Sequence, residues 1–240
     1  MANLFANGVD PLTVLFALLG GVLPAVFWLL FWLREDAKHP EPRSLIITSF
    51  FAGAIAVFIA LPIEKSIVGI FGIGTISTLI LWALTEELVK FGAAATVGLR
   101  SKAYDEPVDA MIYLMTAALG FAALENTLFV LKDLLENGSA IGMLTTSMRT
   151  VGATLLHVAA SALIGGSLAL VFYKSKVSRF FMLIVGIILA TALHTLFNQL
   201  IIATKGEGTL YVFGGLWILI VGIILLFEYI KNRKQPSRII

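Results

Sequence analysis

Seven long apolar runs govern what this chain can fold into. They cover residues 11–33, 44–63, 75–99, 107–131, 147–173, 178–203 and 208–230, with short connections between them. Crossing the hydrocarbon core of a bilayer takes about 20 mostly apolar residues in a helix. Open strands leave backbone groups unsatisfied in lipid, and no run alternates with the period of a barrel strand. The sequence therefore predicts an all-α, polytopic membrane helical bundle of about seven transmembrane helices.

Composition excludes several other classes of protein. Hydrophobic residues make up 59% and charged residues 13% of the 240 residues, which leaves no room for a separate soluble domain. We therefore expect one integral membrane domain spanning 1–240. The absence of cysteine excludes thiolate nucleophiles and cysteine metal sites. The net charge of +2 gives no reason to expect a nucleic-acid partner. Residues 1–10 lack lysine and arginine, so we expect the first run to be a retained span.

The connections between the runs differ in positive charge. Those after the first, third, fifth and seventh runs hold twelve basic residues: Arg34, Lys38, Arg43, Arg100, Lys102, Lys174, Lys176, Arg179, Lys231, Arg233, Lys234 and Arg238. The opposite connections hold Lys65, Lys132, Arg149 and Lys205. Because basic residues mark cytoplasmic connections, we expect the N-terminus outside and the C-terminus in the cytoplasm.

Two further segments bear on helix packing. Residues 64–74 (EKSIVGIFGIG) follow the second run and could form an interfacial or re-entrant stretch. Small residues in the fifth run are expected to let helices approach closely, namely Ala159, Ala160, Ser161, Gly165 and Gly166.

A few ionisable residues lie deep inside the runs, where each is costly unless it faces the bundle interior. They are Glu86, Glu87 and Lys90 in the third run, Glu125 in the fourth, His157 in the fifth and His194 in the sixth. At about 1.5 Å per residue, the acids and histidines lie roughly 9 to 17 Å from the outer ends of their runs. This common depth predicts one shared site. The third histidine, His39, lies in the first cytoplasmic connection and is excluded.

The third run combines two acids with one base. At 100° per residue, Lys90 falls between Glu86 and Glu87, one turn further along the helix. We expect Lys90 to neutralise one carboxylate and to leave the other for chemistry or metal binding. A purely structural ion pair is the alternative. Two histidines and three glutamates at one depth are typical of a divalent metal site, such as zinc, with an open position for water.

The absence of several known catalytic motifs restricts the type of hydrolytic site that the chain can hold. The chain has no HExxH zinc motif and no GxSxG serine elbow. Asp105 and Asp109 lie at the membrane edge, so no intramembrane aspartate pair is present either. A hydrolytic centre of glutamate and histidine remains.

In these residues the chain resembles the PrsW-type intramembrane proteases, distant relatives of the CAAX prenyl protease and Abi group. The resemblance rests on DAKHPEPR (36–43), EELVK (86–90), FAALEN (121–126), His157 and HTLFN (194–198). The wider superfamily often has histidine where this chain has Glu125.

The resemblance implies an endopeptidase that cleaves membrane-associated proteins, with site-1 cleavage of an anti-sigma factor as the associated activity. It suggests that Glu125, His157 and His194 hold a metal, with zinc expected, or position water. Glu86 or Glu87 would then be the general base beside Lys90, and Asn198 would assist the oxyanion. We expect a membrane protein substrate, the lipid bilayer as surroundings, and a prokaryotic cytoplasmic membrane as the location. A proton- or cation-coupled transporter and a non-catalytic scaffold like the Aph-1 subunit of gamma-secretase are the alternatives.

Overall fold

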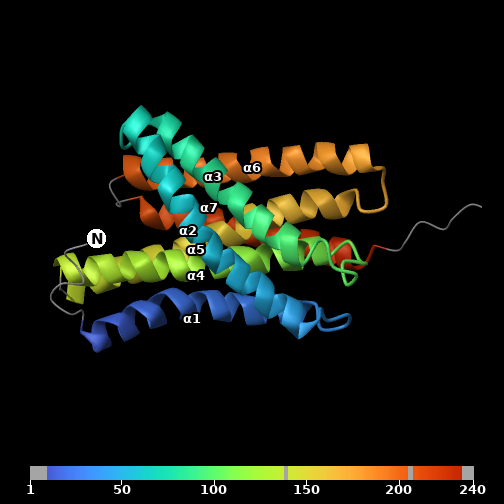
Figure 1. Cartoon of the computed structure of the whole chain (residues 1–240), viewed down its shortest axis with the longest axis horizontal. Helices are drawn as coiled ribbons and strands as arrows, with labels where there is room; N and C mark the ends of the chain where they lie inside the picture. The colour runs from blue at the N-terminus through green and yellow to red at the C-terminus, as the bar shows by residue number, and fades with distance from the viewer. Residues whose placement is uncertain (1–9, 138–139, 205–207, 234–240) are drawn as a thin grey trace, which may run out of the picture.

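The computed structural model describes residues 10–137, 140–204 and 208–233, and every regular element among them is a helix. The helices are α1 (Pro11–Glu35), α2 (Arg43–Phe71), α3 (Ile76–Val97), α4 (Asp109–Asn137), α5 (Ala140–Leu170), α6 (Lys176–Ala203) and α7 (Thr209–Lys231). They run back and forth as one bundle (Figure 1). The predicted all-α, polytopic bundle is confirmed.

Six of the seven helices are long and apolar enough to cross a membrane. The exception, α3, has 22 residues, and its charged residues Glu86, Glu87 and Lys90 lower its apolar character. All three side chains are buried within the protein. The helix that falls outside the apolar class is thus the one that carries the buried charges.

The centre of the bundle consists of α4 and α5, whose spanning segments are mostly buried. Helices α1 and α2 pack on α4, α6 and α7 pack on α5, and α3 bridges α2 and α6. The outer helices expose large apolar side chains such as Phe27, Phe58 and Ile218, as a surface in contact with lipid would. This arrangement brings α3, α4, α5 and α6 around one interior point.

Close contact between α2 and α4 depends on two glycines. A Cβ atom at Gly53 would lie 1.9 Å from the carbonyl oxygen of Ala117, and one at Gly120 would lie 1.8 Å from that of Phe50. The predicted small-residue contact of α5 is also present, because a Cβ atom at Gly165 would lie 2.7 Å from the Cα atom of Met111 in α4. The helices can approach this closely only because side chains are absent there.

Residues 64–71 continue α2 and do not form a separate interfacial stretch. No proline occurs between Ile63 and Phe71, and the helix ends where Gly72 adopts a φ of +80°. The Thr78 hydroxyl then donates to the Gly72 carbonyl at 2.6 Å and fixes the turn into α3. This longer α2 carries Glu64 inside the helix.

Candidate active site

The ion pair expected in α3 joins Lys90 to Glu87. Lys90 Nζ lies 2.6 Å from Glu87 Oε1, and both side chains are completely buried. The ammonium also lies 5.3 Å from the centre of the Phe121 ring of α4. Glu86, the neighbouring acid of α3, therefore forms no ion pair with Lys90.

His194 of α6 is held by the same Glu87 oxygen. Its Nδ1 atom lies 2.9 Å from Glu87 Oε1. The carboxylate can only accept, so Nδ1 carries the hydrogen, and in the neutral imidazole Nε2 keeps its lone pair. Nε2 lies 3.7 Å from Glu86 Oε2.

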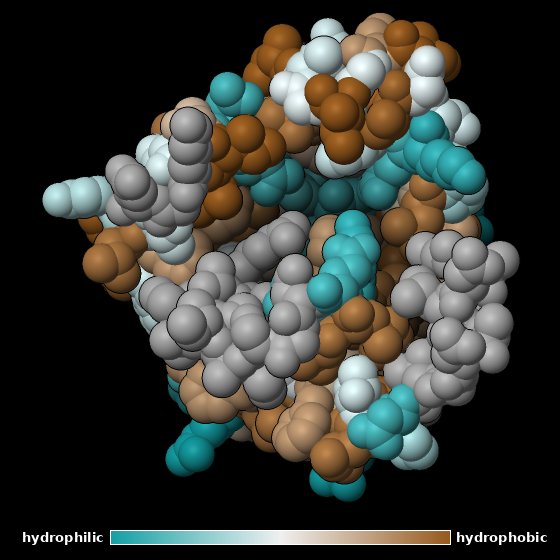
Figure 2. Space-filling model, turned by 90° about the vertical axis from the view of Figure 1, so that its left-hand side faces the viewer, coloured by the Kyte–Doolittle hydropathy of each residue, from teal (hydrophilic) through white to brown (hydrophobic). Residues whose placement is uncertain are grey.

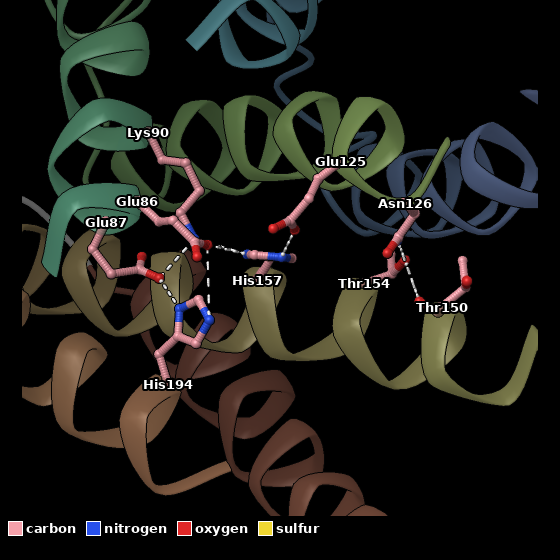
Figure 3. Close-up of polar contacts among 9 residues, drawn as sticks. All are labelled: Glu86, Glu87, Lys90, Glu125, Asn126, Thr150, Thr154, His157 and His194. Carbon is pink, nitrogen blue, oxygen red and sulfur yellow. Dashed lines mark hydrogen bonds and ion pairs between the residues drawn. The ribbon is translucent and has the colours of Figure 1, made fainter. Parts of the chain in front are cut away.

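His157 of α5 has a partner on each ring nitrogen (Figure 3). Its Nε2 atom lies 2.8 Å from Glu125 Oε2 and its Nδ1 atom 2.9 Å from Lys90 Nζ. The ammonium can only donate and the carboxylate can only accept, so Nε2 carries the hydrogen and Nδ1 the lone pair. The two imidazoles therefore both turn a lone pair toward the interior of the cluster.

Glu86 lies between these two lone pairs. Its Oε2 atom is buried without a hydrogen-bond partner among the described residues, 3.8 Å from His157 Nδ1 and 3.7 Å from His194 Nε2. These distances are too long for hydrogen bonds. They are close to the spacing of atoms that share one metal ion, each about 2.0–2.2 Å from it. Within the described chain, Glu86, His157 and His194 form the group whose donor atoms could hold a cation.

The donor set suits a divalent cation such as zinc, because it offers two imidazole nitrogens and one carboxylate oxygen. Each imidazole also has a carboxylate on its other nitrogen, Glu125 for His157 and Glu87 for His194. Such partners are the usual outer shell of histidine ligands. A cation bound by all three groups would take the His157 lone pair, so Lys90 would then bond to Glu87 alone.

The two remaining residues expected at the site occupy different positions. Glu125 reaches the cluster through His157, and its side chain is the most exposed of the group at 19%. Asn198 lies one turn beyond His194 on α6 and is half-buried. In the described part of the chain, Asn198 forms no hydrogen bond with the cluster.

Asn126 is the last residue of the FAALEN motif and was given no role of its own. Its amide donates to Thr154 Oγ1 at 3.0 Å, so it ties α4 to α5 one turn from the His157–Glu125 pair. Glu64 was not considered at the site, because it lies in segment 64–74, which could have been an interfacial or re-entrant stretch. Its carboxylate interacts electrostatically with Glu86, Lys90 and Glu125. The sequence signal that could have identified Glu64 is its position directly after the second apolar run.

His39 lies away from this cluster, as expected. It is in the α1–α2 connection, at the end of the bundle opposite the α2–α3 turn (Figure 1), 3.5 Å from Glu106 Oε1 through Nδ1. Nearby, Asp36 is 2% exposed, and burial, followed by the Glu41 and Glu106 carboxylates, raises its pKa to about 7. Burial also raises the pKa of Glu41, which accepts a hydrogen bond from the Tyr113 hydroxyl.

Taken together, the helices and the cluster define a polytopic membrane protein with a buried glutamate and histidine centre suited to hydrolysis. The sequence model of the PrsW family of intramembrane metalloproteases matches residues 41–227. The chain belongs to this family and is an intramembrane protease.

Individual relatives support the same family assignment. The chain is 28% identical to Protease PrsW of Geobacillus kaustophilus over 190 residues. This aligned region covers 78% of this chain and 80% of the relative. It is 30% identical over 131 residues to Protease PrsW of Bacillus subtilis, covering 53% of this chain and 59% of the relative. No solved structure matches the chain. These comparisons favour the protease over the transporter and the scaffold.

Proposed function

We propose that the protein is a zinc-dependent endopeptidase that cleaves a membrane-anchored protein near the outer face of a prokaryotic cell membrane. The observation that carries the proposal is the unpaired Glu86 Oε2 atom between two imidazole lone pairs. The charge of the connections supports an N-terminus outside. The resemblance of the motifs makes an anti-sigma factor the first substrate to try.

The geometry favours an exchange of two roles expected from the sequence. Glu86 would be the third ligand beside His157 and His194, in place of Glu125. Glu125 keeps the most exposed carboxylate of the cluster, so it is the better candidate for a base that meets water. Glu87, bonded to Lys90 and His194 and fully buried, would position the histidine.

A bound divalent cation polarises a carbonyl and lowers the pKa of water. Glu125 would take a proton from water as the water oxygen attacks the scissile carbonyl carbon. Glu125 would then return the proton to the amine as the C–N bond breaks, which gives one carboxylic acid product and one amine product. His157 would hold Glu125 in place through its Nε2 hydrogen. Asn198 remains our candidate for the amide that donates to the oxyanion.

The test combines elemental analysis with cleavage of single-span reporter proteins by purified protein in detergent. Glu86→Gln and His194→Ala should lose both bound zinc and cleavage. Glu125→Gln should retain zinc and lose cleavage by about 100-fold or more. Glu136→Gln changes an exposed acid of the same helix and should match the wild type in both.

Two results would contradict the proposal. Full cleavage by Glu86→Gln and His194→Ala would remove the active site from this cluster. Loss of zinc in Glu125→Gln, with zinc retained in Glu86→Gln, would restore the roles expected from the sequence.

A further inference from the structure

Glu64 is an acid of the site region that the mechanism above does not use. It lies seven residues after Val57 and four after Ala60, so the three residues share one face of α2. Val57 and Ala60 belong to the same buried cluster as Phe121 of α4. Glu64 extends that face by one turn toward the α2–α3 turn, just as Glu125 extends the face of Phe121 by one turn.

The surroundings of Glu64 confirm that it faces inward. It is half-buried, whereas Lys65 and Ser66, which follow it, and Ile63, which precedes it, are exposed. The indole nitrogen of Trp82 donates to the Glu64 carbonyl at 3.0 Å. Trp82 lies one helical turn before Glu86, so this bond fixes Glu64 beside the part of α3 that carries the site.

The Glu64 carboxylate interacts electrostatically with Glu125, Glu86 and Lys90. Within the described residues it has no ion-pair partner of its own. Ionised Glu64 would therefore add negative charge close to Glu125, whose side chain is the most exposed of the cluster. The end-on view shows a recess with a hydrophilic surface beneath the α2–α3 turn (Figure 2).

Charge around the site is unbalanced. With Glu86 bound to a metal and the other three acids ionised, Glu64, Glu86, Glu87 and Glu125 would carry four negative charges against the single positive charge of Lys90. A divalent cation would still leave one negative charge in excess. Glu87 is neutralised by Lys90, and Glu86 would be a metal ligand, so the excess falls on Glu64 and Glu125.

We propose that Glu64 determines specificity by binding a lysine or arginine side chain of the substrate next to the scissile bond. A basic side chain that pairs with the half-buried Glu64 carboxylate would gain more than an exposed ion pair does. A neutral side chain would gain nothing, and an acidic one would be repelled. This inference rests on the proposed protease function of the cluster.

The experiment uses single-span reporters whose cleavage site is first mapped by mass spectrometry. One residue near the scissile bond is then made lysine, glutamine or glutamate. The measured quantity is the ratio of kcat/KM between the lysine and glutamine reporters, because a general change in activity cancels in a ratio. In the wild type this ratio should be about 5 to 20, corresponding to one ion pair.

Three variants are compared. Glu64→Gln should bring the ratio close to one, and Glu64→Lys should make the glutamate reporter the best substrate. Lys65→Gln changes the charge of the adjacent, exposed residue and should keep the wild-type ratio. The wild-type preference should also fall as ionic strength rises, since salt screens the pair.

The outcomes separate the two proposals. A wild type that cleaves the reporters with a ratio near one, or a ratio unchanged by Glu64→Gln and Glu64→Lys, overturns the role of Glu64 and leaves the protease function intact. A wild type that cleaves no reporter contradicts both.

Discussion

Replacing Gly53 with alanine tests the contact on which the position of α2 depends. An ordinary contact between an aliphatic carbon and a carbonyl oxygen is about 3.3 Å or longer. The new Cβ atom would lie 1.9 Å from the Ala117 oxygen, so α2 and α4 must separate by about 1.4 Å. The obstacle is backbone, which no side-chain rotation can relieve.

The free energy follows from two opposing effects. Overpacking of this kind costs about 1–3 kcal/mol, and a rigid backbone contact belongs at the upper end. Alanine gains about 0.5–1 kcal/mol over glycine inside a helix. We therefore expect Gly53→Ala to lower the free energy of unfolding by about 2 kcal/mol. Cleavage should fall as well, because α2 carries Glu64 and packs beside Phe121.

Thermal unfolding in detergent, measured together with reporter cleavage, checks this expectation. Gly69→Ala is the matched control, because Gly69 lies on the same helix with nothing within 4 Å of its added Cβ atom. It should unfold at or slightly above the wild-type temperature. If Gly53→Ala proved as stable and active as Gly69→Ala, the close contact of α2 and α4 would be refuted.

Three further predictions concern charge and metal. Because the pKa of Asp36 is raised to about 7 in the folded protein, folding binds a proton between about pH 4 and 7, and this group's contribution to stability falls as pH rises through that window. Asp36→Asn should therefore be more stable than the wild type at pH 8, by up to about 4 kcal/mol, and equal at pH 4. Parallel unfolding curves of the two proteins across pH would contradict it. Lys90→Met should cost about 3–5 kcal/mol by leaving the buried Glu87 carboxylate without its cation. Adding Glu87→Gln should recover much of this in thermal unfolding, and a double variant no more stable than the single one would argue against the pair. Removal of metal with a chelator should abolish cleavage and readdition of zinc should restore it, whereas cleavage that survives verified metal depletion would exclude a metal role.

The helices and the gathering of charged residues were predictable from the sequence for the same physical reason. Lipid offers no partner to a polar group, so apolar runs must be helices and buried charges must meet inside the bundle. The convergence of Glu86, His157 and His194 from three helices follows from this rule. Pairing of Lys90 with one acid followed from their spacing on a single helix.

Individual contacts were less predictable, since they depend on how helices are rotated and shifted against one another. A shift of one turn, about 5.4 Å, exchanges one potential ligand for another. Glu125 was therefore expected at the metal, whereas in the structure Glu86 faces both imidazole lone pairs and Glu125 bonds to the far nitrogen of His157. Glu64 was misplaced because the apolar run ends near residue 63, while the helix ends at Gly72, where the backbone changes direction.

The arrangement links the stability of the bundle to its chemistry. Small-residue contacts that do not involve the site residues join α4 to α2 and to α5, so these helices can stay in place whatever the state of the site. Besides their apolar contacts, α3 and α6 are joined through Glu86, Glu87 and His194. The unpaired Glu86 Oε2 atom is costly to bury, and a cation shared by three helices would relieve this cost. Metal binding should consequently stabilise α3 and α6 against the rest of the bundle, and it is these helices that would loosen first without it.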